Sequence, residues 1–453
     1  MSSNVNMLEG PIQKNIIRFS IPLIISSFLS MTYSLCDQII LGRFVGTEAL
    51  AAVSASSYPI GLINTLFAGL AVGVNIISAR AAGSRDYQKI SKVLHTSVGL
   101  GLVAGLILVL LGMVFAKPLL VLMKTPDEIL GDSLLYMRLY FLGCPITFVS
   151  SFGGAILRSQ GNTKTPMIYG AISGIANVML NLILVVGFNM TIAGVAIATL
   201  ISQFISFVLI MLTLMHPGVY GRLDIRRLTF DWDLIKTIIK VGIPAGLGSM
   251  VFTVSNAQQQ SYINSFGTAA IAGNHAASSI SGIIYCCIFS TMSSVAINFI
   301  GQNVGAGNLE RAKEILKKCI WNVVVFGVSL SVLVFIFKTP LLHVYIDDDV
   351  AVEFGRKSML ISVLPMTIWG ISEVFTGALR GYGYTMAPTI IPLISTCGVR
   401  FLWLTFIFPL LPVFQMVMAA GPVCGVITTS AQVIFYLMQK KKTNNFENII
   451  SEK

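Results

Sequence analysis

Three charged side chains interrupt long apolar stretches of this 453-residue chain: Asp37, Glu373 and Arg400. A charge at the centre of a membrane helix costs roughly 2.5–3.5 kcal/mol on insertion scales, so such residues are usually compensated and functional. A carboxylate in apolar surroundings can take up a proton from one side of a membrane and release it on the other. It can also supply the hard oxygen ligand that a cation such as sodium requires. We therefore expect Asp37 to handle an ion; the alternative is a structural hydrogen bond between helices.

Glu373 and Arg400 fall in neighbouring apolar stretches and carry opposite charges. They could form a buried pair, which either handles substrate or ions or only neutralises the two charges. A polar stretch in another apolar segment adds four amides, Asn256, Gln258, Gln259 and Gln260. Amides that face lipid would lack hydrogen-bond partners, so we expect at least some of them to face the interior. We predict that these residues, with Glu373 and Arg400, line a substrate cavity; hydrogen bonding between helices is the alternative.

The composition places these residues in a membrane protein. The chain is 55% hydrophobic and 11% charged, whereas a soluble domain carries about 25% charged residues. Its seven cysteines have no metal-ligand spacing, and we find no Walker motif, metal cluster or Ser-His-Asp set. We therefore expect neither an enzyme nor an ATP-driven pump, and no metal, cofactor or catalytic residue.

Apolar runs of about 20 residues or more, separated by charged or turn residues, predict twelve membrane-spanning helices. The first half contains 16–42, 49–79, 93–115, 135–158, 165–187 and 191–215. The second half contains 237–264, 269–301, 315–337, 357–380, 387–409 and 415–438.

The basic residues indicate the orientation of these spans. Most of the 30 Lys and Arg residues lie before the first span, after the last one, or in the loops on that same side. Positive charge marks the cytoplasmic side, so we expect both termini in the cytoplasm. The net charge of +11 is then a topology signal, and with no soluble basic domain we expect no nucleic-acid binding.

The chain repeats itself after 222 residues. Residues 157–166 and 379–388 both read L-R-x-x-G-x-T-x-x-P, and Ile-Pro at 21–22 returns at 243–244. Six spans per half make the two repeats parallel, an arrangement typical of transporters with a site between their halves. The glycine and proline of the motif suit a tight turn. We predict four regions: a six-helix lobe at 1–215, a cytoplasmic linker at 216–236, a second lobe at 237–438 and a cytoplasmic tail at 439–453.

The chain resembles the multidrug and toxic compound extrusion (MATE) family. The resemblance covers nearly the whole chain and is carried by the paired motifs, by Pro22, Tyr33 and the DQIILGR segment at 37–43, and by GAGNLERA at 305–312. The seventh span has glutamines at 258–260 where other branches carry an acid, so the chain looks most like the DinF-like branch. The resemblance implies an all-α, V-shaped membrane fold of two parallel six-helix repeats. It also implies export of amphipathic, often cationic compounds in exchange for protons or sodium ions.

The resemblance assigns site residues one by one. Asp37 corresponds to the carboxylate of the first span, and Pro22 to the proline at which that span bends and gates the site. Tyr33 precedes the carboxylate by one turn, and Asn177, Asn181 and Thr199 match polar positions of the fifth and sixth spans that would join it in an ion-coupling site. One departure is Asn181, which stands where this branch usually has Asp. The site would then hold one carboxylate, and the coupling ion stays open between H+ and Na+.

Together these observations predict an exporter that works by alternating access. We expect a monomer in the inner membrane of a bacterium, with an amphipathic small molecule and the lipid bilayer as its partners. Within the same superfamily, a flippase for lipid-linked precursors is the alternative, but such proteins tend to have extra spans and a strongly cationic cavity. A passive channel or a membrane enzyme would be a different class, and no selectivity-filter-like glycine run supports it.

Overall fold

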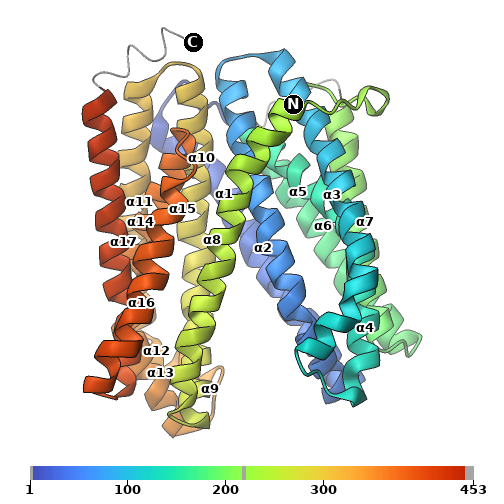
Figure 1. The fold of residues 1–453 in the computed structure, drawn as a ribbon, viewed down its shortest axis with the longest axis vertical. Helices are drawn as coiled ribbons and strands as arrows, with labels where there is room; N and C mark the ends of the chain where they lie inside the picture. Colours follow the sequence, from blue (N-terminus) through green and yellow to red (C-terminus); the bar gives the residue numbers. More distant parts are fainter. Residues whose placement is uncertain (1–3, 217–220, 444–453) are drawn as a thin grey trace. The chain divides into compact units, whose positions relative to one another are not determined.

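The computed structural model describes residues 4–216 and 221–443, and every regular element within these ranges is a helix (Figure 1). Ten helical segments are long and apolar enough to cross a membrane, and two bent helix pairs bring the number to twelve. The expected all-α architecture with twelve spans is therefore confirmed. Most helices run several residues beyond the predicted apolar limits, because polar residues at a helix end can keep helical geometry outside the hydrocarbon layer.

The chain forms two compact units, here named the N-unit and the C-unit. The N-unit contains the residues up to Gly10 together with Ile17–Leu247, and the C-unit contains Pro11–Ile16 together with the residues from Gly248 onward. The division falls inside two long helices: α8 (Trp232–Asn264) is divided after Leu247, and α1 (Ile12–Ile40), which otherwise belongs to the N-unit, gives its first residues up to Ile16 to the C-unit. Residues 217–220 of the expected linker lie outside the described residues, and the role of 216–236 as a linker stays a prediction.

The N-unit helices are α1 (Ile12–Ile40), α2 (Thr47–Gly83), α3 (Tyr87–Leu122), α4 (Asp127–Leu142), α5 (Cys144–Ser159), α6 (Lys164–Asn181) and α7 (Ile192–Met215). Short π-helical turns extend two of them, η1 (Leu41–Val45) after α1 and η2 (Leu182–Gly187) after α6. The helices α4 and α5 form one span bent by 47°. A core of fully buried apolar side chains, including Val93, Leu94 and Phe152, joins α3 to α2, α5 and α7.

The C-unit helices are α9 (Thr268–Ile284), α10 (Ser290–Gly305), α11 (Leu309–Ile336), α12 (Lys338–His343), α13 (Asp349–Ser362), α14 (Met366–Gly381), α15 (Ala387–Pro392), α16 (Val399–Leu402) and α17 (Phe414–Thr443). Non-α turns join or follow several of them: η4 (Tyr285–Phe289), η5 (Leu393–Gly398), η6 (Trp403–Ile407) and η7 (Phe408–Leu410). The helices α13 and α14 form a span bent by 51°. Helix α14 packs against α10, α11 and α17, and so lies in the interior of this unit.

The sequence repeat is visible in the backbone of both units. In the N-unit, α5 starts after its bend at Cys144; in the C-unit, α14 starts after its bend at Met366, 222 residues later. Each copy of the L-R-x-x-G-x-T-x-x-P motif turns at a glycine in the left-handed region, with φ of 86° at Gly161 and 93° at Gly383. The expected tight turn is therefore confirmed in both copies, and glycine suits it because other residues rarely adopt this conformation.

The first part of α8 packs closely on α2 within the N-unit. Gly246 faces the backbone of Leu66, and a methyl group at position 246 would lie 2.6 Å from the Leu66 carbonyl oxygen. Gly69 on α2 and Gly242 on α8 face each other in the same way. Small residues spaced by four positions let two membrane helices approach this closely.

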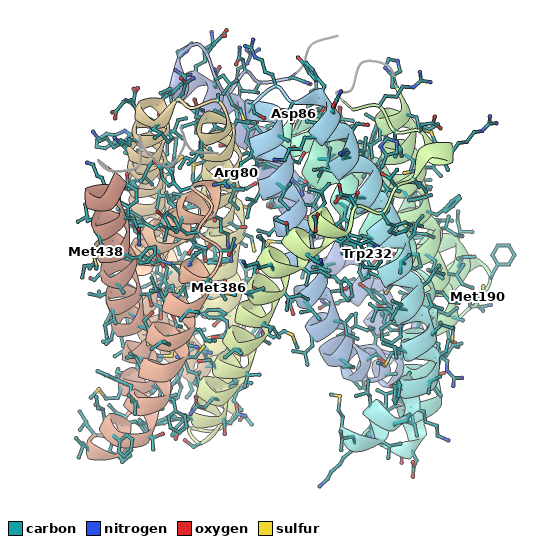
Figure 2. All side chains as sticks on the ribbon, turned by 45° about the horizontal axis from the view of Figure 1, so that its top comes forward. Arg80, Asp86, Met190, Trp232, Met386 and Met438 are labelled. Carbon is teal, nitrogen blue, oxygen red and sulfur yellow. The ribbon has the colours of Figure 1, made fainter. Side chains whose placement is uncertain are left out.

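A short polar turn connects α2 to α3 at the end of the N-unit where Arg80 and Asp86 are labelled in Figure 2. The Asp86 carboxylate accepts a hydrogen bond from the backbone N–H of Lys89 at 2.9 Å and so caps α3. Such a cap satisfies one of the amide groups that a helix start leaves unpaired. Polar capping of this kind is consistent with a helix end that lies outside the apolar part of the membrane.

Candidate functional site

A pocket of about 380 Å³ lies within the N-unit, between α1, α6 and α7. Asp37 is the one charged residue in its lining. The other lining residues are small or polar: Ser26, Leu29, Ser30, Tyr33, Ser34, Gly170, Ala171, Ser173, Gly174, Asn177, Thr199, Ser202 and Gln203. The pocket thus gathers Asp37 with Tyr33, Asn177 and Thr199, which sequence analysis assigned to one site.

Two amides approach the carboxylate of Asp37. The side-chain nitrogen of Asn181 donates to Asp37 Oδ1 at 2.6 Å. The amide of Asn177 fits its surroundings better with its O and N atoms exchanged, and in that orientation its nitrogen donates to the same oxygen at 2.7 Å. These two N–H groups give the partly buried carboxylate oxygen the hydrogen-bond partners that such a group needs. Asn181, which replaces the usual acid, therefore binds Asp37 directly.

The side chain of Asn181 has a second polar atom, Oδ1. Asn181 is fully buried, with 0% of its surface exposed, and its Oδ1 has no hydrogen-bond partner. A buried acceptor without a partner is destabilising and calls for an explanation such as a missing ion or water. This oxygen is therefore available to a cation or to a proton donor.

Helix α1 places Asp37 and Tyr33 on one face. Ser26, Ser30, Tyr33 and Asp37 follow one another at intervals of four, three and four residues, which brings them to the same side of a helix. The Tyr33 hydroxyl donates to the carbonyl oxygen of Ala171 at 3.3 Å. The Tyr33 ring occupies the space that a Cβ at Gly174 would fill. Glycine at 174 thus lets α1 and α6 meet at the pocket.

Thr199 approaches the site from α7. Its hydroxyl donates to the backbone oxygen of Val195 at 2.9 Å and lies 3.5 Å from the side-chain amide of Asn177. Pro22 lies inside α1, fifteen residues before Asp37, where its ring removes one backbone hydrogen bond from the helix. Pro22 is not part of the pocket lining, and its gating role stays a prediction.

The possible ion pair between Glu373 and Arg400 does not form. No ion pair within residues 4–216 and 221–443 joins the two side chains. The Glu373 carboxylate instead accepts a hydrogen bond from the Tyr285 hydroxyl at 2.8 Å. Arg380, two turns along the same helix α14, is the basic residue that interacts with Glu373 electrostatically. The sequence analysis did not predict this interaction, because Arg380 belongs to the L-R-x-x-G-x-T-x-x-P motif, which was assigned to a turn.

Arg400 lies in α16 with 4% of its surface exposed. Its Nη1 donates to Asn256 Oδ1 at 2.6 Å and to Ser255 Oγ at 3.2 Å. The ring of Phe252 lies 5.6 Å from the guanidinium carbon. All three contacts come from α8, so the C-unit holds this charge at the packing of α8 on α16.

The four amides of α8 do not converge on one point. Asn256 binds Arg400, whereas Gln259 donates to the backbone oxygen of Val417 on α17 at 3.2 Å. Gln260 donates to Asn264 on its own helix at 2.9 Å, and Gln258 is half-buried. Hydrogen bonding between helices thus accounts for Gln259, and a substrate-binding role for these residues stays a prediction.

Sequence reasoning missed several members of the N-unit pocket. Ser26, Ser30 and Ser34 of α1, with Ser173 of α6 and Gln203 of α7, were not singled out. Their signal was helical spacing: Ser34 lies three residues before Asp37, Ser173 four before Asn177 and Gln203 four after Thr199, and Ser30 and Ser26 continue the same face of α1 at intervals of four. Within the described residues, no group of three or more His, Cys, Asp and Glu side chains could hold a metal ion.

Comparison with known proteins places this geometry in a family. The family model described as MatE matches residues 22–183 and 244–407. The probable multidrug resistance protein YoeA of Bacillus subtilis (strain 168) is 26% identical over 390 residues, 84% of each chain. The FAD transporter of Shewanella oneidensis is 28% identical over 403 residues, 87% of each chain.

A solved structure adds the fold. A multidrug resistance MATE family transporter of the MOP superfamily, in an outward-facing conformation, superimposes with a TM-score of 0.88 at 20% identity over 99% of each chain. At this sequence identity the structural similarity shows the fold alone, and the assignment to a family rests on the family model. That model covers most of both repeats, and the chain belongs to the MatE family of multi-pass membrane transporters.

Proposed function

We propose that this chain exports amphipathic small molecules across a bacterial inner membrane in exchange for protons or sodium ions. The observation that carries the proposal is the Asp37 carboxylate, the one charge in the N-unit pocket, held by the amides of Asn181 and Asn177. Relatives named as multidrug resistance proteins support drug export. The relatives' names give no support to a flippase of lipid-linked precursors.

Coupling to protons has a simple route through the Asn177 amide. While Asp37 is ionised, both Asn177 and Asn181 donate N–H groups to it. A protonated Asp37 becomes a hydrogen-bond donor, and the Asn177 oxygen can accept that bond once the amide turns over. Taking up a proton would therefore rearrange the packing of α6 on α1 without moving any charged residue.

Coupling to sodium would use the same atoms differently. A hard cation prefers oxygen ligands, and Asn181 Oδ1 is a buried oxygen without a partner next to the carboxylate. Rotated amides of Asn177 and Asn181 would turn their oxygens toward the ion, and Thr199 could add a hydroxyl oxygen. One carboxylate suits a monovalent cation, because binding then neutralises the site.

The transport cycle follows from this neutralisation. An ion from outside neutralises Asp37, the contact between α1 and α6 changes, and Pro22 gives α1 a place at which to bend. Alternating access then releases substrate outward. Moving one positive charge out against 100 mV costs about 2.3 kcal/mol, and one entering cation offsets this electrical cost.

The charge of the substrate is open within this proposal. The family resemblance predicts cationic compounds, and Asp37 could attract them. An acid that binds the coupling ion cannot at the same time balance a substrate charge, so cation and substrate would compete for Asp37. A relative named as a FAD transporter supports the alternative of an anionic substrate.

The topology and assembly are part of the same proposal. We place both termini in the cytoplasm because most Lys and Arg residues fall on their side of the predicted spans. The protein is proposed to work as a monomer, because each unit gathers its own polar residues.

The test measures transport of a fluorescent amphipathic compound in everted vesicles, under a pH gradient alone and under a sodium gradient alone. The wild type should respond to one gradient, and that gradient names the ion. Asp37→Asn should abolish the response, whereas Asp347→Asn should keep it, because Asp347 is an exposed carboxylate far from the pocket in sequence. Equal transport by Asp37→Asn and wild type would refute the role of Asp37.

A further inference from the structure

The two units carry opposite charges at related positions. In the N-unit, Asp37 on α1 faces α6; in the C-unit, Arg400 on α16 faces α8. The 222-residue repeat matches α1 with α8, and it matches the Asn177–Asn181 region of α6 with α16. The position equivalent to Asp37 is the uncharged Gln259. The contact between corresponding helices thus contains an acidic residue in the N-unit and a basic residue in the C-unit.

Within the part of the chain that the structure describes, the positive charge of Arg400 has no acidic partner. Its hydrogen-bond partners are neutral side chains, Asn256, Ser255 and the thiol of Cys424, and the thiol of Cys397 lies nearby. No carboxylate among the described residues forms an ion pair with it. A buried charge without compensation is strongly unfavourable. A negative group from outside the chain would supply what the C-unit lacks.

The guanidinium also keeps a free donor. Nη1 donates to both Asn256 and Ser255, while Nε–H is buried and has no partner. Arginine binds carboxylates and phosphates through two parallel N–H groups. An oxygen bound to Nε would place a second oxygen of the same group beside Nη2. The edge of Arg400 that carries the unpaired Nε–H therefore matches the shape of an oxyanion.

Aromatic side chains lie beside the guanidinium group of Arg400. The Phe252 ring lies 5.6 Å from the guanidinium carbon and is 37% exposed, so the charge lies one side chain below the surface of the C-unit. Trp369 meets Phe252 edge-on, with ring centroids 6.3 Å apart. Aromatic rings beside an anion-binding group suit a compound that is apolar at one end and anionic at the other.

We propose that Arg400 binds the phosphate or carboxylate of an amphipathic anionic substrate, with Asn256 and Ser255 orienting the guanidinium and Phe252 contacting the apolar part. This inference rests on the proposed function, because it specifies the charge of the exported compound. It divides the work between the units: the N-unit binds the coupling cation, and the C-unit recognises the anion. It also removes the competition for Asp37 that a cationic substrate would create.

Binding measured without any ion gradient tests the proposal. Riboflavin and riboflavin 5′-phosphate share one ring system and differ in a phosphate, and both can be titrated by fluorescence against the purified protein in phosphatidylcholine nanodiscs. The phosphate should bind about tenfold tighter or better, as expected for hydrogen bonds to a charged group. Inorganic pyrophosphate should displace the phosphorylated compound and leave riboflavin bound.

Variants locate the effect at Arg400. Arg400→Gln should reduce the preference to about twofold or less, and Arg400→Lys should keep part of it, because lysine retains the charge and loses the paired donors. Arg356→Gln, at an exposed residue whose guanidinium lies 3.5 Å from Glu353, is the matched control and should keep the full preference. Arg400→Lys also covers the case in which Arg400→Gln does not fold.

Three results would overturn the proposal: no preference in the wild type, an unchanged preference in Arg400→Gln, or loss of the preference when phosphatidylglycerol is added. The last result would assign Arg400 to a lipid headgroup. Because no gradient is applied, a phosphate preference can survive even if Asp37→Asn transports normally. The failure of the ion-coupling proposal and the failure of this one are therefore distinguishable.

Discussion

Gly174 and Gly170 offer a matched pair of substitutions in the candidate ion site. Both glycines line the pocket from α6, one helical turn apart. A methyl group at 174 would overlap the ring of Tyr33, whereas a methyl group at 170 has no atom within 4 Å. We therefore expect Gly174→Ala to disturb the site and Gly170→Ala to leave it intact.

The magnitude follows from two opposing terms. Alanine in place of a helical glycine stabilises a protein by about 0.5–1 kcal/mol, and this gain applies at both positions. Overpacking costs about 1–3 kcal/mol and applies at Gly174 alone. Gly174→Ala should thus be about 1–3 kcal/mol less stable than Gly170→Ala, a difference set by the overlap with Tyr33.

Two assays check this expectation. Thermal unfolding in detergent should show a lower Tm for Gly174→Ala, by about 2–4 °C per kcal/mol for a unit of 150–250 residues. Gradient-driven export should also fall, because a displaced Tyr33 shifts the face of α1 that carries Asp37. Combining Gly174→Ala with Tyr33→Ala removes the overlap, so the two losses should not add. Equal Tm and export for Gly174→Ala and Gly170→Ala would refute the reasoning.

Two further predictions concern α6 and α8. Asn181→Leu removes the 2.6 Å hydrogen bond to Asp37; a bond to a charged group contributes about 1.5–3 kcal/mol, so thermal unfolding should show the protein destabilised by about that amount. An unchanged melting curve would mean that this bond does not hold α6 against α1. Gly246→Ala places a methyl group 2.6 Å from the Leu66 carbonyl oxygen and should destabilise the protein by about 1–3 kcal/mol. Gly61→Ala, with no atom within 4 Å of the new methyl group, is its control, and equal melting curves for the two would argue against the close helix contact.

The spans were predictable because a membrane helix is defined by the length of its apolar run. The bends at α4–α5 and α13–α14 were not, although Pro145 and Pro365 stand beside them. A proline in a continuous apolar run signals a possible break, but apolar length alone does not register it. The two bends are therefore evident only from the backbone of the structure.

The candidate site, like the fold, was predictable from the sequence only in part. The family resemblance predicted that Asp37 and Asn181 belong to one site, and the two side chains form a hydrogen bond. The possible contact between Glu373 and Arg400 does not form. The order of two spans along the chain does not show on which face of its helix, or at which depth, each side chain lies. Glu373 lies two turns from Arg380 on its own helix, a spacing that the sequence already contained.

Helix α8 has a practical consequence for cutting the chain. The charged segment before it looks like the natural place to separate the two repeats, yet the part of α8 up to Leu247 belongs to the N-unit. Fragments made by such a cut would leave the first unit without the glycine surface that packs on Gly69. Two separately expressed halves should therefore assemble only when both are present, with the first fragment exposing an unfilled groove along α2.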